Sequence, residues 1–257
     1  MARHIEALMD GVRLSDLGRI VIRSVDEPDP EMEIEYINRP WRGGREVQKR
    51  KRKSLSITIN AAIHELYDLP KRNAIRQAIA EWCDGSILEL SNHPEQRLHV
   101  ISKKEPSLGD VRDYNSELAI ELEANEIPYW EDKAKNTASG TGTTGSTTLT
   151  IAGTAKEIPV EVTFTPGSAI TALTVTVACK GITKTIALSG MPSSSGAIVF
   201  GRDEKDRLTI KRGTTSLLRY RSEESADDLT VPAGIATVSW TAGASGSISF
   251  SARGRWL

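Results

Sequence analysis

The sequence predicts a mainly β protein made of an N-terminal β domain with one α-helix and a C-terminal β-sandwich. Three observations lead to this fold class. Segments with alternating apolar and polar residues recur along the chain, one segment has helical periodicity, and an uncharged segment rich in Thr, Gly and Ser, residues 136–148, separates two stretches of different composition. The 257 residues suffice for two ordinary domains, and a content of 26% charged and 39% hydrophobic residues is typical of soluble globular proteins.

The strands of the first domain are predicted from alternation with a period of two residues. In "EMEIEYI", residues 31–37, three apolar residues occupy one face of the strand and three glutamates, Glu31, Glu33 and Glu35, occupy the other. "RPWRGGREV", residues 39–47, is interpreted as a turn and a return strand. Further strands are expected over residues 18–25, 54–59, 86–90, 96–103 and 116–125.

One α-helix is predicted within residues 68–85. Asp68 is the expected N-cap, Pro70 suits the first turn, and Gly85 is expected to end the helix. The apolar residues of this segment recur at helical spacing and form one stripe, which is expected to lie across a sheet: Ala74, Ile75, Ala78, Ile79 and Trp82.

The segment 136–148 is interpreted as a flexible linker, because Gly, Ser and Thr without charge are typical of linkers. The predicted domains are residues 1–134 and 135–257. The first carries 20 Lys and Arg against 25 Asp and Glu, a net charge of −5, and the second carries 13 against 9, a net charge of +4. This asymmetry can orient the domains toward different neighbours but selects no partner.

The second domain is expected to consist of strands separated by turns, with no helix of useful length. Alternating segments spaced by Gly, Pro and Ser favour a sandwich or a jelly roll. The expected strands are residues 146–151, 158–166, 170–178, 182–188, 196–201, 206–211, 234–241 and 246–256.

The run "KRKRK", Lys49–Lys53, leads directly into the alternating strand 54–59. A cationic run is the usual electrostatic footprint for phosphate, but no aromatic residue interleaves with it and no recognition helix adjoins it. We expect it to meet protein carboxylates or solvent, with DNA contact as the alternative. The glutamates of residues 31–35 are the nearest opposing charges, in the same subunit or in the next.

The sequence predicts no catalytic, cofactor-binding or metal-binding residues. "GTGTTG", residues 140–145, lacks the preceding strand and following helix of a dinucleotide site. The four histidines and two cysteines have no ligand spacing, and Cys83 and Cys179 are expected to be reduced core residues. The acidic residues between 26 and 31 lack the frame of a calcium loop. The first residues, "MARHIEALMDG", do not have the apolar core of a signal peptide, and no apolar stretch is long enough for a membrane span.

The order of features resembles the distal tail proteins of long, flexible-tailed bacteriophages. The resemblance rests on three features. A basic-to-apolar strand is followed by the helix, and the first domain ends in "PYW", residues 128–130. The "PAG" turn, residues 232–234, is followed by two terminal strands. The family usually has an Asn after the Gly of that turn, whereas this sequence has Ile235.

The resemblance implies a structural virion protein with no catalytic residues. It implies a homo-oligomeric ring, usually of six subunits, at the end of the tail tube, with tail-tube-like first domains around the DNA channel and galectin-like second domains pointing outward. The implied partners are the tail tube protein, proteins associated with the tail tip and tape measure, and receptor-binding proteins. DNA would only pass through, no membrane would be involved, and the protein would be made in the bacterial cytoplasm and end in the tail tip.

Two other functions are weighed against this one. A carbohydrate-binding module or adhesin would need exposed aromatic residues on a concave face, for which the second domain offers only Tyr220, Trp240 and Trp256. Trp240 lies on an alternating strand, so the core is its expected place. An enzyme is disfavoured because no set of acid, base and nucleophile emerges.

Overall fold

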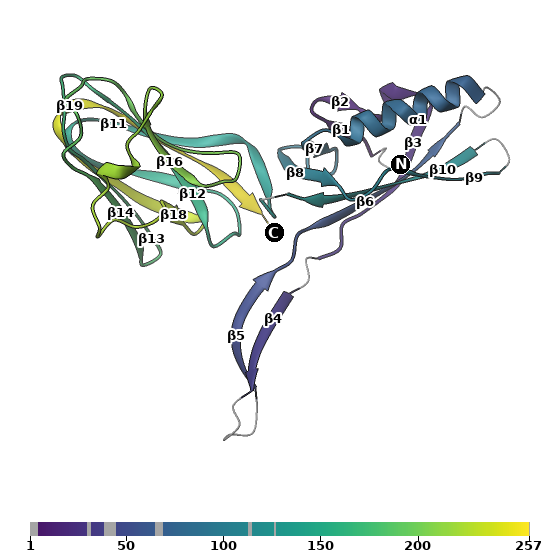
Figure 1. The fold of residues 1–257 in the computed structure, drawn as a ribbon, viewed down its shortest axis with the longest axis horizontal. Helices are drawn as coiled ribbons and strands as arrows, with labels where there is room; N and C mark the ends of the chain where they lie inside the picture. Colours follow the sequence, from purple (N-terminus) through teal and green to yellow (C-terminus); the bar gives the residue numbers. More distant parts are fainter. Residues whose placement is uncertain are drawn as a thin grey trace. The chain divides into compact units, whose positions relative to one another are not determined.

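The computed structural model describes residues 5–29, 32–38, 45–64, 69–112, 115–125 and 127–256. The chain separates into two compact units, Met1–Tyr129 and Trp130–Leu257, whereas the predicted division follows Ala134. The mainly β fold class is confirmed, and among the described residues the single α-helix lies in the first unit (Figure 1).

The first unit is built on an antiparallel sheet. The strand β6 lies between β3 and β10, and the other edge of β10 pairs with β9 at its beginning and with β8 at its end. The sheet continues from β8 through β7 and β1 to β2. The bounds are Ala7–Met9 (β1), Val12–Arg13 (β2), Ile20–Asp26 (β3), Ser56–Ile63 (β6), Ile87–Leu90 (β7), Gln96–Ser102 (β8), Ser107–Arg112 (β9) and Asn115–Ala124 (β10).

The predicted alternation on β6 and β10 is confirmed. Every second residue is buried along β10, and the same holds on β6 up to Ala61, after which Ala62 and Ile63 are buried as well. The register brings the buried residues of the two strands together, as at Ile59 and Ile120. The residues between them, such as Thr58 and Glu121, lie on the other face, which stays partly open to water. Because a strand alternates its side chains, the pair supplies a core layer on one face and a polar surface on the other.

The helix α1, Leu69–Cys83, lies across one face of this sheet (Figure 1). Pro70 stands in its first turn as predicted, and Asp68 lies outside the described residues. Ile75, Ile79 and Trp82 are buried, and the Trp82 indole N–H donates to the carbonyl of Val12 at 2.8 Å. The helix then ends at a turn in which the Gly85 N–H donates to the carbonyl of Trp82 at 3.2 Å.

The prediction that Ala74 belongs to the buried stripe is wrong, because its side chain is exposed. Successive helical residues are rotated by about 100°, so Ala74 lies well to one side of the line through Ile75 and Ile79. Ala78 is half-buried at the margin of the same line.

The second unit contains two layers that share their first and last strands. In one layer β11 pairs with the first half of β19, which pairs with β13 and then β14. In the other, β11 pairs with the second half of β19, followed by β12, β15, β16 and β17, and β18 pairs with the start of β12. The bounds are Trp130–Ile151 (β11), Ile158–Pro166 (β12), Leu173–Cys179 (β13), Ile182–Leu188 (β14), Ile198–Arg202 (β15), Leu208–Arg212 (β16), Thr215–Ser216 (β17), Thr230–Val231 (β18) and Gly234–Trp256 (β19).

The prediction of a flexible linker over residues 136–148 is wrong. These residues lie within β11 and pair with β19 almost throughout. The register shifts between Gly142 and Thr144, and Gly142 has a φ of +123°, so the strand bends here from one layer into the other.

The glycines on either side of the bend make room for Trp240, which is only 5% exposed. A Cβ atom on Gly140 would lie 2.1 Å from the Cη2 atom of the Trp240 ring, and one on Gly145 would lie 2.4 Å from its Cζ2 atom. The glycine-rich composition therefore serves a close contact across the bend and not chain flexibility.

Both cysteines are buried and free, as predicted. Burial, with a smaller effect of the Asp84 carboxylate, raises the pKa of the Cys83 thiol to about 12. The thiol is therefore protonated and unreactive at neutral pH.

The Trp240 contact predicts that Gly145→Ala will destabilise the second unit. The backbone at Gly145 is not in the left-handed region, so the effect is the steric one of overpacking, about 1–3 kcal/mol. Chemical denaturation of the full chain measures it. Gly201→Ala is the matched control, because an added Cβ there meets atoms no nearer than 3.7 Å. Equal stability of the two variants would contradict the packing account.

Candidate assembly surfaces

A two-stranded ribbon extends from the first unit. It consists of β4, Met32–Asn38, and β5, Arg45–Arg52, which form a sheet of their own. In Figure 1 the ribbon continues the course of β3 and β6 beyond the end of the first unit's sheet. The return strand predicted within residues 39–47 is therefore present from Arg45 onward, and the turn before it lies outside the described residues.

The register of the ribbon places the basic run opposite the glutamates. Glu33 faces Lys51 and Glu35 faces Lys49 across the two strands, and Glu31 lies outside the described residues. Opposite charges at directly facing positions stabilise an antiparallel pair, whereas like charges there destabilise it. The two charged segments therefore meet within one chain.

Large apolar side chains of the same ribbon are exposed. Tyr36 and Val47 face one another across the strands and are 49% and 52% exposed, and Ile37 is also exposed. A two-stranded ribbon is marginally stable in water unless it packs on another surface. An exposed pair of large apolar side chains on such a ribbon is typical of a contact that is completed by a partner.

The open face of the first unit's sheet carries a row of carboxylates on β10. Each of them has a cation of the same chain nearby: the Nζ atom of Lys104 lies 2.7 Å from Glu121, and that of Lys103 lies 3.7 Å from Glu123. Arg23 on β3 lies 3.5 Å from Glu117 in the same way. These lysines and this arginine reduce the negative potential of the face, although such exposed pairs contribute little to stability.

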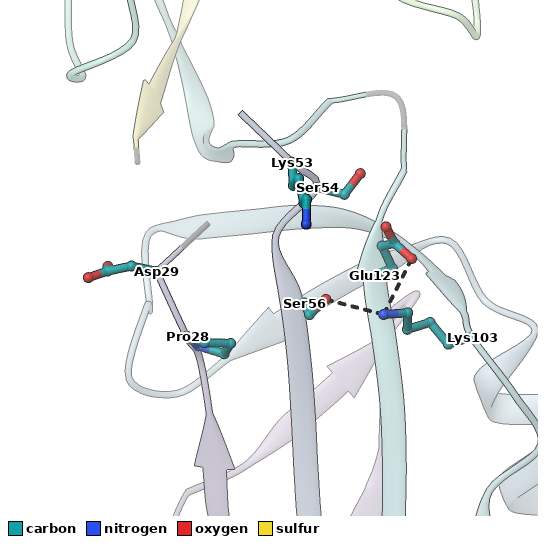
Figure 2. A pocket seen from close by; sticks show the side chains of 7 residues that line it. All are labelled: Pro28, Asp29, Lys53, Ser54, Ser56, Lys103 and Glu123. Carbon is teal, nitrogen blue, oxygen red and sulfur yellow. Dashed lines mark hydrogen bonds and ion pairs between the residues drawn. The ribbon is translucent and has the colours of Figure 1, made fainter. Parts of the chain in front are cut away.

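A polar pocket of about 340 Å³ lies where the ribbon joins the sheet (Figure 2). The last cation of the basic run, Lys53, lines it together with Asp29, Lys103 and Glu123. Lys103 reaches toward Ser56 at 3.5 Å as well as toward Glu123. Two carboxylates beside two ammonium groups give this pocket no strong preference for phosphate.

A second hollow, of about 300 Å³, lies beside the helix. Its lining is mainly apolar, with Val12, Leu17 and Trp82 on three different segments of the first unit. It is therefore a second surface on which an apolar partner can pack.

His93 and Asp26, two ionisable residues of the first unit, are engaged in local contacts. The ring of His93 lies 2.9 Å from Glu27 and 3.1 Å from Gln96, and Asp26 accepts a hydrogen bond from Asn60 at 2.8 Å. In the described ranges no three His, Cys, Asp or Glu residues are grouped so as to hold a metal. No described helix is long and apolar enough to cross a membrane.

The aromatic residues of the second unit do not form a platform. Trp240 is in the core, as expected from the alternation. The Trp256 indole donates to Asp132 at 2.7 Å, and the guanidinium of Arg219 lies 4.7 Å from the ring centre of Tyr220. A sugar would therefore find no open pair of stacked rings among these three residues.

A buried ionic cluster closes the second unit at the ends of β11 and β19. The guanidinium of Arg255 donates from Nε to Glu131 at 3.0 Å, and from its two terminal nitrogens to Asp206 at 2.9 and 3.0 Å. Arg255 and Glu131 are each about 6% exposed. Burial alone would lower the pKa of Arg255, but the hydrogen bonds and charges of Asp206 and Glu131 outweigh this effect and raise the pKa. The Arg255 guanidinium therefore keeps its charge although it is buried.

Sequence reasoning missed this cluster. Its members lie 49 and 124 positions apart in the sequence, so no local spacing connects them. The alternation of β19 gives no signal either, because it places Arg255 on the same face as Ser251 and Arg253, which is not the buried face.

Solved structures that are similar to the whole chain include proteins of phage adsorption and baseplate assemblies. One is the Dit protein of phage SPP1, described as a hub of the adsorption apparatus in phages that infect Gram-positive bacteria. It superposes with a TM-score of 0.73 at 12% identity, over 97% of this chain and 98% of that one. The likeness to a distal tail protein is thereby confirmed at the level of the fold.

Two more distant similarities point the same way. Chains in the phage P2 baseplate, in its activated conformation with Ca and with Sr, superpose with TM-scores of 0.51 and 0.52 at 9% and 10% identity, over 98% of both chains. No protein-family profile matches the sequence, and no curated protein matches it.

The ribbon register predicts that charge reversal at Glu33 is repaired by reversal at Lys51. Glu33→Lys places like charges at facing positions and weakens the strand pair, while the double variant Glu33→Lys with Lys51→Glu restores it. The coupling is expected to be roughly 0.2–1 kcal/mol and to shrink at high salt. Amide hydrogen exchange in β4 and β5 measures it. Glu95→Lys, at an exposed site, is the control. If the effects of the two reversals on amide exchange were simply additive, the facing of Glu33 and Lys51 would be contradicted.

The buried cluster predicts a large cost for Arg255→Leu. The substitution leaves the Glu131 carboxylate buried without its cation, which costs about 3–5 kcal/mol. Denaturant unfolding of the full chain tests this. The matched control is Arg207→Leu, which removes an exposed ion pair with Asp203 and is expected to cost less than about 1 kcal/mol. Similar losses in the two variants would show that burial does not govern the cluster.

Proposed function

We propose that this protein is a structural virion protein, a distal tail protein that joins the end of a phage tail tube to the baseplate or tail tip. The observation that carries the proposal is the similarity to the SPP1 Dit hub along nearly the full length of both chains. Because fold alone does not fix function, the surfaces of the molecule provide the second line of support.

The first unit is proposed to form a closed ring of six copies. A ring is closed by heterologous contacts, in which one surface of a subunit meets a different surface of the next. The exposed pair Tyr36 and Val47 on the ribbon is one such surface, and the apolar hollow beside Trp82 is a complementary one. The polar face of β10 is proposed to line the channel, where paired carboxylates and lysines let DNA pass without holding it.

The second unit is proposed to be a galectin-like sandwich that serves as the attachment point for receptor-binding or other baseplate proteins. Its two layers around a dry apolar core support this assignment. Further proposed partners of the protein are the tail tube protein and proteins associated with the tail tip and tape measure. Its place is the phage tail tip, after synthesis in the host cytoplasm.

The two alternative functions receive less support. A carbohydrate-binding module acting through the second unit would need an aromatic platform, and the three candidate aromatic residues are buried or engaged. An enzyme that used Cys83 as its nucleophile would need a thiol of lowered pKa, whereas burial raises the pKa of this thiol to about 12.

The ring proposal predicts that Tyr36→Ser combined with Val47→Ser will abolish the ring without unfolding the chain. Light scattering and negative-stain imaging are expected to show rings of about six copies for the unmodified protein and single copies for the variant. The control is Ile182→Ser with Val199→Ser, which removes comparably exposed apolar side chains, 44% and 41%, from the second unit.

Two results would overturn the proposal. One is an unmodified protein that remains a single copy at high concentration, both alone and with tail tube protein. The other is the absence of this polypeptide from purified particles of its source, as measured by mass spectrometry.

A further inference from the structure

The second unit has three sheet edges, and two of them are covered by the chain itself. Along β14, backbone N–H groups of a loop donate to the strand, from Ala226 to the Thr185 carbonyl at 2.8 Å and from Ser222 to the Ala187 carbonyl at 2.9 Å. Along β16, the short strand β17 takes the edge, and the Leu217 N–H donates to the Ile210 carbonyl at 2.8 Å.

The third edge is the outer side of β11, which is the edge of both layers. From residue 136 to residue 151 the strand pairs with β19 on one side, and within the described part of the second unit no strand pairs with its other side. One main-chain group of this strand has a side-chain partner: the Gly142 carbonyl at the bend accepts a hydrogen bond from the Trp240 indole N–H at 3.5 Å.

This edge also lacks the features that usually protect an edge strand. Proteins blunt free edges with lysines, prolines, inward charges or a covering segment, because unpaired N–H and C=O groups otherwise recruit another strand. Residues 136–151 contain no charged residue and no proline, and seven of them are threonine, which favours extended structure. The bend at Gly142 divides the edge, and its longer straight part is Thr144–Ile151.

We propose that the edge of Thr144–Ile151 is a docking site for an extended, uncharged segment of a different polypeptide, which adds to the layer as one more strand. Its main chain would pair with the free N–H and C=O groups of β11, as in other cases of strand addition. Eight residues of such a strand span about 26 Å.

Charge matching identifies the class of occupant. On the inner face of this edge lie the buried Leu149 and Ile151, and a charged side chain of an added strand would lose its hydration beside them, so an uncharged segment fits. A second copy could reach the edge through its own β11, because β14 and β16 are covered, and would then form a two-fold dimer. The edges of β3 and β5 carry charges, among them Arg23 and the basic run. The proposal rests on strand order and composition, and not on the ring proposed above.

A synthetic peptide with the sequence of residues 234–241, GIATVSWT, is the probe, because this segment already pairs with Thr144–Ile151 on the other side. Hydrogen exchange of the full-length protein with excess peptide is expected to slow alternate amides in Thr144–Ile151 and none in β14. The control peptide carries proline in place of Val238, which removes a ladder donor, and is expected to give no protection.

Variants of the chain make the test specific. Ser146→Lys with Thr148→Lys adds charge at exposed side chains of the edge strand and is expected to weaken peptide binding by about tenfold or more. Thr183→Lys with Thr215→Lys adds the same charge on the two covered edges and is expected to leave binding unchanged.

Three results would overturn the proposal: no protection at millimolar peptide, protection confined to other strands, or a peptide-free protein whose edge amides are already protected in a two-fold dimer. Ring formation is scored separately by imaging, so loss of the docking site and loss of the ring are distinguishable.

Discussion

The pairing of β11 with β19 is the interaction on which the second unit depends. These two strands are the first and the last of the unit, and they run antiparallel along nearly their full lengths. Every other layer strand is attached to β19 directly or through a neighbour, so both layers are organised by one bent ladder. The bend is possible because Gly142 takes a positive φ and because Trp240 fills the space beside Gly140 and Gly145. The chain can close this ladder only after its last strand is present, so most of the contacts of the unit are non-local.

In the first unit the corresponding constraint is the alternation of buried and exposed side chains along β6 and β10. One face of β6 and β10 is apolar and packs against the layer that includes α1, while the other carries paired charges. The ribbon of β4 and β5 extends past this core, and its own stability comes from its ladder and from whatever covers Tyr36 and Val47. In the proposed assembly, a partner that covered these two side chains would stabilise the ribbon further.

Much of this fold could be predicted from local patterns. The helix from Pro70 to Trp82 and the strands around Ile59 and Ile120 follow from periodicity, because packing at these positions repeats with the geometry of the element. The facing of Glu33 and Lys51 was accessible because the two charged segments are close in sequence. The bent strand at Gly142 could not be predicted, because Thr and Gly suit a linker and an uncharged edge strand equally. The contact with Trp240 that distinguishes the two is 98 positions away in the sequence. The cluster around Arg255 was hidden for the same reason.

The facing of Trp130 and Trp256 has a practical consequence. Trp130 begins the first strand of the second unit and Trp256 ends its last strand, so the two ends of the unit lie side by side. A unit whose first and last residues lie together can be inserted into another chain with little disturbance of that chain. A tag fused after Trp256 would lie close to Trp130, where the unit begins. A tag inserted in the turn between Cys179 and Ile182 would instead lie at the hairpin end of β13 and β14.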